Sequence, residues 1–311
     1  MSASVVALGG GHGLAASLSA LRHLTEQLTA VVTVADDGGS SGRLRRELGV
    51  LPPGDLRMAL AALCGEGAWG RTWRNVLQHR FASQGELHQH SVGNLLIVAL
   101  WELLGDTVEG LDIVGQLLGA RGRVLPMSAV PLDIEAVVLG LDARDPSSAT
   151  LVHGQVAVAT TTGQVASVRL VPEEPPACSQ AVQAVRDADW VVLGPGSWFT
   201  SVMPHLLVPE LGRALCETTA KRLITLNLTA QAGETYGLSA ESHLEALFVH
   251  AADFNADVVL ADPRVVTDRP ALESVCRSAG ARLVVASVAS KTDPHVHDEL
   301  RLAAAYRDIL G

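Results

Sequence analysis

The chain has 311 residues, a formal net charge of −10 and 48% hydrophobic residues. This length and apolar content provide for a sizeable core in one large domain or two ordinary ones, and the negative charge argues against general nucleic-acid binding. No apolar run comes near the roughly 20 residues that a membrane-spanning helix requires. The four cysteines are far apart, without CxxC spacing or an evident signal peptide, so we expect a cytoplasmic protein with reduced thiols.

The chain opens with a predicted strand, a glycine loop and a predicted helix. Residues 4–8 form a short valine-rich run, Gly9-Gly10-Gly11-His12-Gly13 follow at once, and residues 14–24 have a helical pattern. Glycines allow the backbone to approach a phosphate, and a helix N-terminus presents free N–H groups with a partial positive charge. The string is not GxGxxG and lacks the GKS or GKT ending of a P-loop, so a tight strand-to-helix turn is the alternative interpretation.

The second predicted strand, residues 30–35, ends at two adjacent aspartates, Asp36 and Asp37. They lie roughly twenty residues beyond the glycine loop, where Rossmann-like folds place an acid that binds a ribose hydroxyl. Two neighbouring carboxylates can instead hold a divalent metal through oxygen ligands, or cap the turn. The sequence leaves these three roles open.

Residues 33–57 form a long connection without an obvious core face, which we interpret as a ligand-binding loop. Its glycine–serine stretch, residues 38–42, has the composition of an anion nest, and Arg43 directly behind it can clamp a phosphate. Asp55 is predicted as the N-cap of the next helix. Arg57 lies in the first turn of that helix, where a cation opposes the helix dipole, which hints at a functional role.

Positive charge is concentrated between Arg43 and Arg80, where seven arginines and three acids give a net charge of +4. A positive patch on an acidic protein indicates a small anionic ligand, and a solvated loop and helix face is the alternative. Further along, Ser91 is predicted as the N-cap of a strongly apolar helix over residues 92–104. Asn94 in its first turn places an amide side chain at a helix N-terminus.

The pattern changes after a helix that is predicted over residues 108–118. Residues 134–141, 155–160 and 164–171 have the composition of strands separated by turns, with Thr162-Gly163 as a hairpin tip. We therefore expect a small antiparallel insertion, around residues 130–172, without catalytic residues.

A second strand followed by a glycine loop occurs in the second half of the chain. The unbroken apolar run of residues 190–193 predicts a buried parallel strand. It ends in Gly194-Pro195-Gly196-Ser197, with Thr200 close behind. This loop is a second candidate phosphate cradle, and a tight turn at a strand end is the alternative interpretation. Because both glycine loops follow apolar strands, we predict that they lie near each other at the carboxyl edge of one parallel sheet.

The remaining predicted elements complete the sheet. The strand at residues 221–226 ends at Asn227, and the loop that follows contains Glu234 and Thr235. Polar residues thus collect after the carboxyl ends of several strands, where open α/β sheets bind ligands. We predict one Rossmann-like domain over residues 1–311, a three-layer α/β/α fold with a mostly parallel sheet. The other strands are predicted at residues 258–260 and 282–286, and the helices at 181–188, from about 239, and at 297–310.

Several longer motifs resemble the bacterial gluconeogenesis-factor (YvcK) group, within the larger set of proteins similar to 2-phospho-L-lactate transferase (CofD). The resemblance runs from Val5 almost to the C-terminus. It implies a cytoplasmic protein that cells need for shape and wall synthesis during growth on gluconeogenic carbon, and a UDP-sugar ligand, with UDP-N-acetylglucosamine as the leading candidate. The related transferases move a phospholactyl group onto a deazaflavin precursor. The motifs are VTVADDGGSSGRLR, LPPGD, HSVGNLL, RGRVLP, VVLGPGS and GET.

The chain departs from the pattern of the family at three places. His12 stands where the first glycine loop of the family often has threonine, and Leu238 stands where an aromatic residue often follows the GET loop. Near the C-terminus, Val296-His297-Asp298 replaces a common Arg-His-Asp run. The last two departures affect the positions that the resemblance implies for base and sugar contacts, whereas the phosphate loops follow the pattern.

The leading hypothesis is a regulatory protein that binds a nucleotide sugar and requires no cofactor. It is favoured over an enzyme because no activated nucleophile or acid–base pair has a recognisable spacing. The alternative is a CofD-type transferase that uses a divalent metal such as Mg²⁺ at Asp36 and Asp37, and a nicotinamide-dependent oxidoreductase is a third class. We expect a homodimer, and the sequence does not identify a downstream protein partner. The candidate ligand-binding residues are Gly10, Gly11, His12, Gly13, Asp36, Asp37, Ser40, Ser41, Arg43, Asp55, Arg57, Ser91, Asn94, Gly194, Gly196, Ser197, Thr200, Asn227, Glu234 and Thr235.

Overall fold

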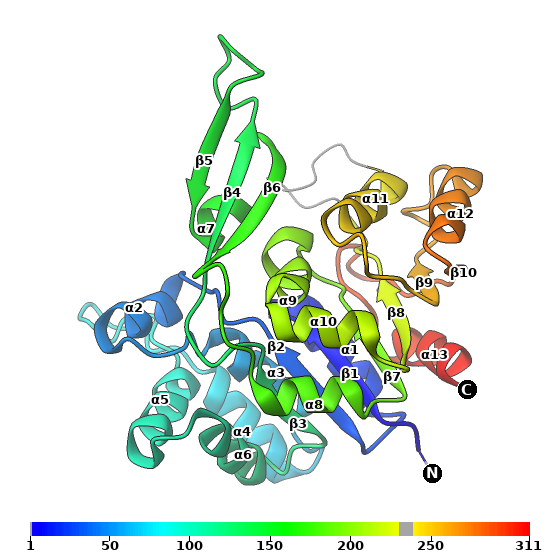
Figure 1. The fold of residues 1–311 in the computed structure, drawn as a ribbon. Coiled ribbons are helices and arrows are strands. Elements are labelled where there is room, and N and C mark those ends of the chain that lie inside the picture. Colours follow the sequence, from blue (N-terminus) through cyan, green and yellow to red (C-terminus); the bar gives the residue numbers. More distant parts are fainter. Residues whose placement is uncertain (1, 230–238) are drawn as a thin grey trace.

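The computed structural model describes residues 2–229 and 239–311. Within them, a seven-stranded parallel sheet of order β10-β9-β8-β7-β1-β2-β3 forms the centre of the molecule (Figure 1). A second sheet of three antiparallel strands, β5-β4-β6, projects from it. The strands are β1 Val5–Gly9, β2 Leu28–Val32, β3 Arg123–Pro126, β4 Asp133–Leu139, β5 Ala149–His153, β6 Gln164–Val171, β7 Trp190–Leu193, β8 Lys221–Thr225, β9 Val258–Ala261 and β10 Arg282–Val285.

Helices cover both faces of the parallel sheet (Figure 1). Helix α1 packs against α3 and α13 on one side, and α8 packs against α10 on the other. The predicted Rossmann-like α/β fold with its antiparallel insertion is therefore confirmed. The helices are α1 Gly11–Leu21, α2 Gly39–Leu48, α3 Gly54–Leu63, α4 Ala68–Gln78, α5 Val92–Leu104, α6 Thr107–Leu118, α7 Gln155–Ala159, α8 Ser179–Arg186, α9 Met203–Leu207, α10 Pro209–Glu217, α11 Ala240–His250, α12 Arg269–Ser278 and α13 Glu299–Leu310, with a π-helix η1 at Trp198–Val202.

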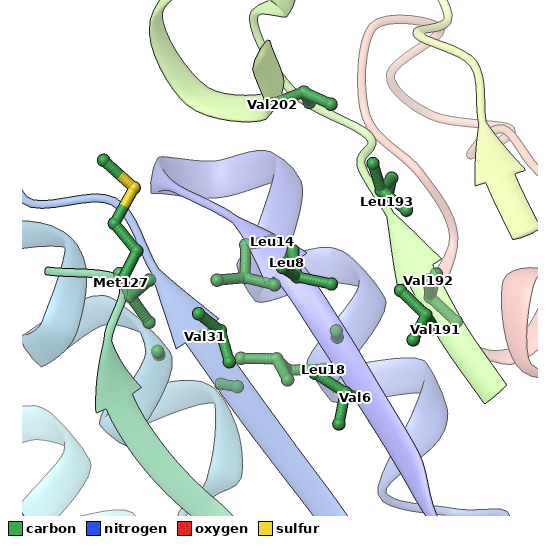
Figure 2. Close-up of a cluster of buried hydrophobic side chains, with 14 of the residues drawn as sticks. Val6, Leu8, Leu14, Leu18, Val31, Met127, Val191, Val192, Leu193 and Val202 are labelled. Carbon is green, nitrogen blue, oxygen red and sulfur yellow. The ribbon is translucent and has the colours of Figure 1, made fainter. Parts of the chain in front are cut away.

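The central strands are continuous apolar runs because both of their faces are covered. All residues of β1 and β7 are buried, as expected for parallel strands between two layers of helices. Figure 2 shows the cluster on these strands, in which Leu14 and Leu18 of α1 lie beside Leu8 and Val31. At the far end of the chain, the buried Tyr306 hydroxyl of α13 lies 2.7 Å from Ser17 Oγ, so the C-terminal helix is joined to α1.

The chain order creates a switch point between β1 and β7. From β1 the chain continues to β2 on one side, and from β7 it continues to β8 on the other. The connections after these two adjacent strands therefore diverge, which leaves a crevice at the carboxyl edge of the sheet, where open α/β folds bind ligands. The two glycine loops begin at this crevice.

Several predicted elements need correction. Residues 33–57 are not one open connection, because helix α2 forms within them. The predicted strand at residues 155–160 is wrong: these residues contain α7, a short helix, and β5 supplies the third antiparallel strand instead. Thr162-Gly163 is consequently not a hairpin tip, since β5 and β6 each pair with β4 rather than with each other. Edge strand β3 is an additional element that the sequence pattern did not predict.

Tertiary contacts explain the helical state of α7. Its alternating valines suit a strand, yet Gly154 at its start adopts φ 91°, and the Val156 N–H donates to Asp37 Oδ1 at 3.0 Å. A carboxylate from a distant loop therefore accepts a hydrogen bond from the first turn, and such contacts override weak local propensity. No helix within the described residues is long and apolar enough to cross a membrane.

Candidate functional site

The first glycine loop contains two kinds of glycine. A side chain at Gly10 would overlap with Thr33 and Asp55, and one at Gly13 would overlap with the Pro195 carbonyl, so both positions serve close packing. Gly11 has φ 57° and faces open space. The N–H groups of His12 and Gly13 have no acceptor among the described residues, as is usual in the first turn of a helix. This part of the loop therefore offers backbone donors to a ligand.

The second glycine loop lies directly against the first. Since Gly13 packs on Pro195, the prediction that the two loops meet at one edge of the sheet is confirmed. Asn227 holds this loop by accepting from the Gly196 N–H at 2.8 Å and donating to the Gly196 carbonyl at 2.7 Å. Ser197 Oγ accepts from the Thr200 N–H at 3.0 Å and caps η1. In this structure, therefore, Asn227 and Thr200 shape the loop.

Helix α2 begins in the predicted anion nest and is joined to α5 by side chains. Ser40 Oγ accepts from Asn94 Nδ2 at 3.1 Å and from the Ser91 N–H at 3.3 Å, and it lies 3.1 Å from His90 Nδ1. Ser41 Oγ lies 3.4 Å from the same amide. These serines are buried at a helix–helix junction, so they position α2 and α5 at the crevice.

Ser91 is the first residue outside α5, as predicted, but its hydroxyl does not cap that helix. Its Oγ donates to the Leu77 carbonyl at 2.9 Å. The side chain therefore ties the start of α5 to the end of α4.

The two adjacent aspartates point in different directions. Asp36 Oδ1 accepts from the Gly38 N–H at 2.9 Å, and Oδ2 would lie 2.7 Å from a side chain at Gly54, the first residue of α3. Asp37 instead faces the antiparallel insertion, where it accepts from the Val156 N–H and packs against Gly154. The pair does not form one two-carboxylate site in this structure.

Asp55 is the carboxylate that lies close to Asp36. The predicted N-cap role of Asp55 is wrong, because Pro53 occupies the N-cap and Asp55 lies within the first turn of α3. The carboxyl group of Asp55 accepts a hydrogen bond from the N–H of Gly11, the first residue of α1. Burial, and then repulsion by Asp36, raise the pKa of Asp55 to about 7, against partial compensation by the Gly11 hydrogen bond and Arg57.

Arg57 is buried beside these carboxylates. Its side chain is 3% exposed, Nε donates to Asn94 Oδ1 at 2.9 Å, and Nη1 has no hydrogen-bond partner within the described residues. Burial and the charge of Arg80 lower the pKa of Arg57 to about 10, while Asp55 and Asp36 oppose that change. An unpaired buried donor costs roughly 1–3 kcal/mol, and more when it is charged, so Nη1 lacks the acceptor that a buried guanidinium group normally has.

Arg43 has a different environment from the predicted phosphate clamp. Its Nη1 donates to the Glu86 carbonyl at 3.0 Å and its Nη2 to the His88 carbonyl at 2.8 Å. The guanidinium therefore fastens the connection between α4 and α5 onto α2.

The tail of the chain returns to the glycine loops and brings His297 to them, in the Val296-His297-Asp298 run that the family resemblance relates to base and sugar contacts. A cavity of about 180 Å³ lies between His12, Asn227, His295 and His297. Burial lowers the pKa of His297 to about 4, so its imidazole is neutral at physiological pH, and Nε2 is buried without a partner in the described part of the chain. Thr33, with an unpaired buried hydroxyl behind Gly10, was missed, because a threonine inside an apolar strand gives no functional signal.

The arrangement thus combines hydrogen-bond donors with two carboxylates at one edge of the sheet. Donors come from the α1 N-terminus and Arg57, and the carboxylates are Asp36 and Asp55. No cluster of three or more histidine, cysteine, aspartate or glutamate side chains with metal-binding geometry occurs within residues 2–229 and 239–311. Glu234 and Thr235, which the sequence nominates, lie outside the described residues.

A doubly wound parallel sheet with polar side chains at its switch point defines a Rossmann-like α/β protein. The model of the family described as 2-phospho-L-lactate transferase CofD matches residues 5–300. A protein of Mycobacterium tuberculosis described as a putative gluconeogenesis factor is 54% identical over 307 residues, which cover 98% of this chain and 89% of that protein. The gluconeogenesis factor of Bacillus subtilis is 36% identical over 264 residues, or 85% of this chain and 80% of that protein. The chain belongs to the CofD family and, within it, to the group of gluconeogenesis factors.

Solved structures agree with this assignment. The crystal structure of a Bacillus halodurans protein superposes with a TM-score of 0.88 at 31% identity, covering 98% of this chain and 99% of that one. A second structure, described as a UPF0052 family member from the same organism, gives a TM-score of 0.86 at 32% identity, with 97% and 98% coverage. The fold and the family resemblance are therefore confirmed together.

Proposed function

We propose that this protein binds a nucleotide sugar in the crevice at the carboxyl edge of the sheet, beside its two glycine loops, with UDP-N-acetylglucosamine as the leading candidate. The observation that carries the proposal is the buried, unpaired Nη1 of Arg57 together with the free N–H groups at the start of α1. Asp55 links the two, because it accepts from the Gly11 N–H and interacts with the charge of Arg57. A diphosphate supplies acceptors for both kinds of donor, and a helix N-terminus favours its negative charge. An apolar ligand would leave the Nη1 group of Arg57 without a hydrogen-bond acceptor.

The carboxylates of the site suit the hydroxyl groups of a sugar. Asp36 and Asp55 lie close enough to repel each other, so near neutral pH Asp55 carries a proton in part of the molecules. A protonated carboxyl donates a hydrogen bond and an ionised one accepts, so together they can satisfy a hydroxyl in both directions. In this proposal, Asp37 holds the insertion and does not touch the ligand.

Membership of the gluconeogenesis-factor group supports a proposal for the biological role. We infer a cytoplasmic regulatory protein that links the supply of a wall precursor to cell shape and wall synthesis during gluconeogenic growth. The name of the relatives, gluconeogenesis factor, supports the metabolic part of this role. A homodimer is part of the proposal, and the downstream partner stays open.

Calorimetric titration tests the binding proposal. The parent should bind UDP-N-acetylglucosamine saturably without added metal, and more tightly than GTP or NAD. Arg57→Lys keeps the charge but loses the forked guanidinium, so affinity should fall about tenfold or more, the loss expected for a hydrogen bond to a charged group. The matched control is Arg74→Lys, since Arg74 is a half-buried arginine that donates to the Ala61 and Cys64 carbonyls.

Two outcomes would contradict the proposal. If no UDP-sugar binds saturably, the proposed class of ligand is wrong. If the parent and folded Arg57→Lys bind with equal affinity, Nη1 of Arg57 does not contact the ligand. Thermal unfolding without ligand separates these outcomes from a loss of folded protein.

One observation favours a second function, a CofD-type transferase with a divalent metal. Asp36 and Asp55, rather than Asp36 and Asp37, bring two carboxylates together, and hard cations such as Mg²⁺ use one or two carboxylates plus substrate phosphates. If this function holds, EDTA should abolish ligand binding by the parent, and Asp36→Asn should abolish the magnesium-dependent binding because the metal loses an anionic ligand. If the protein is a binder, affinity should persist in EDTA and Asp36→Asn should lower it only modestly. Asp37→Asn is the matched control for both cases.

A further inference from the structure

A second cavity, of about 540 Å³, lies between α10 and the segment that follows α11. It is separate from the crevice beside the glycine loops. Its size is within the range of small-molecule sites, roughly 300–1,000 Å³. Leu206 of α9 and Phe254 line it, and Phe254 is 1% exposed, so the cavity has an apolar floor. Cys216 of α10 also lines it and is half-buried. The site proposed above does not use any of these residues.

The rim of this cavity is charged, with an excess of acids. Glu217 and Asp253 line it together with Arg213, and none of the three forms an ion pair within the described residues. The pKa of the Cys216 thiol is raised by burial, then by the charge of Asp253, with Glu217 adding to this effect and Arg222 opposing it. The carboxylates therefore act on the cavity interior and not only on the solvent outside.

Two structural links connect this cavity to the second glycine loop. His250, on its wall, packs edge-on against Phe199 with ring centroids 5.9 Å apart. Phe199 belongs to η1, the π-helix that Ser197 caps. In addition, η1 continues directly into α9, whose Leu206 lines the cavity.

From this geometry we propose that the cavity is a second ligand site, for a small molecule with an apolar body and a positively charged group, and that its occupancy alters η1. The apolar floor takes the body of the molecule, and Glu217 and Asp253 take the charge. Because the interior is close-packed, a ligand that displaces the His250 ring also displaces Phe199. The effect on nucleotide-sugar affinity rests on the proposed function, whereas the site itself does not.

Disulfide exchange at Cys216 tests the site with defined probes. Three thiols compete for this cysteine in the form of their disulfides. N-benzyl-2-aminoethanethiol, the benzylamine probe, carries an apolar ring and a positive charge. The other two are 2-aminoethanethiol, which carries the charge alone, and 2-phenylethanethiol, which carries the apolar ring alone. Cys64, Cys178 and Cys276 are buried, so Cys216 is the accessible thiol of the parent. Ser278→Cys adds a reference thiol on the exposed end of α12. At equilibrium, peptide mass spectrometry should show at least a fivefold preference for the benzylamine probe at position 216 and little preference at position 278.

The charged rim has its own control. A double variant, Glu217→Gln with Asp253→Asn, should keep the preference for the aromatic body and lose the preference for the amine. Equal probe ratios at positions 216 and 278 would overturn the site, and an unchanged amine preference in the double variant would overturn the assigned chemistry.

Hydrogen exchange and calorimetry test the transmission. Attachment of the benzylamine probe should change amide exchange of residues 197–202 at least threefold, and His250→Ala should cancel the change because the ring contact is gone. Unchanged exchange would overturn the transmission. With the probe attached, affinity for UDP-N-acetylglucosamine should shift at least threefold. If the unmodified protein binds no nucleotide sugar, the proposed function fails, while the disulfide and exchange measurements still decide the second site.

Discussion

Replacement of Asp55 by asparagine should change how stability depends on pH. In the folded chain the pKa of Asp55 is about 7, against 3.8 for an ordinary aspartate. Between these values the folded protein holds a proton that the unfolded chain has released, so folding stability falls as pH rises through this window. The contribution of the protonated Asp55 to the free energy of unfolding is lost in full above pH 7. Each pKa unit corresponds to about 1.36 kcal/mol. From pH 5 to pH 8, ionisation of Asp55 therefore costs the parent about 3 kcal/mol that Asp55→Asn avoids.

Asparagine retains an oxygen that can accept from the Gly11 N–H, so the variant loses the charge without losing the contact. Stability is measured by urea unfolding and by thermal melting at pH 5, 6, 7 and 8, without ligand. The difference between variant and parent should grow by about 3 kcal/mol across this range. Asp36→Asn should give a smaller effect of the same sign, because it removes only the repulsion, and Asp37→Asn should follow the parent. If the free energy of unfolding depends on pH in the same way in the parent and in Asp55→Asn, the pKa of Asp55 is not raised in the folded protein.

Three further predictions concern the parts that shape the crevice. Gly13→Ala should destabilise the protein by about 3 kcal/mol or more, since the new methyl group overlaps with Pro195, whereas Gly11→Ala should cost only about 1–2 kcal/mol for its left-handed backbone; thermal melts compare them. Tyr306→Phe should lower the free energy of unfolding by about 1–2 kcal/mol, because its buried hydroxyl joins α1, β8 and α13; urea unfolding measures this. Asp37→Ala should speed amide exchange in α7 at least tenfold while a control peptide in α8 is unchanged, because α7 loses its acceptor at Val156.

The parts of the fold that the sequence could predict are those with strong local signals. Buried parallel strands are unbroken apolar runs, so residues 190–193 were predicted with their observed bounds, as was the helix at residues 92–104. The crevice could also be located, because glycine loops after two strands must meet where those strands are neighbours. Hydrophobic periodicity and turn residues depend on only a few neighbouring positions, so the sequence alone predicts these features.

The errors arise where distant contacts decide the local structure. Residues 155–160 alternate like a strand, but Asp37 binds the first turn of the helix that forms there. Asp36 and Asp37 are adjacent in the sequence, but their side chains point in different directions. The carboxylate that lies close to Asp36 belongs to Asp55, and no rule of sequence spacing predicts that contact. Likewise, Arg43 follows a glycine-rich stretch, and only the structure shows the carbonyl groups that occupy it.

Most candidate residues of the crevice act on the protein itself, and this narrows where ligand selectivity can arise. Gly10 and Gly13 permit close packing, and Asn227 holds the second loop. A substitution at such positions would disturb the loops for every ligand alike. Among the described residues, the groups that we propose to contact the ligand are the first-turn N–H donors, Arg57 and the Asp36–Asp55 pair. All of them suit the phosphates and hydroxyls that nucleotide sugars share. Under the proposed function, discrimination between one sugar or base and another therefore falls to side chains around the edge, and among the described residues His12 and the neutral His297 line the small cavity beside the loops.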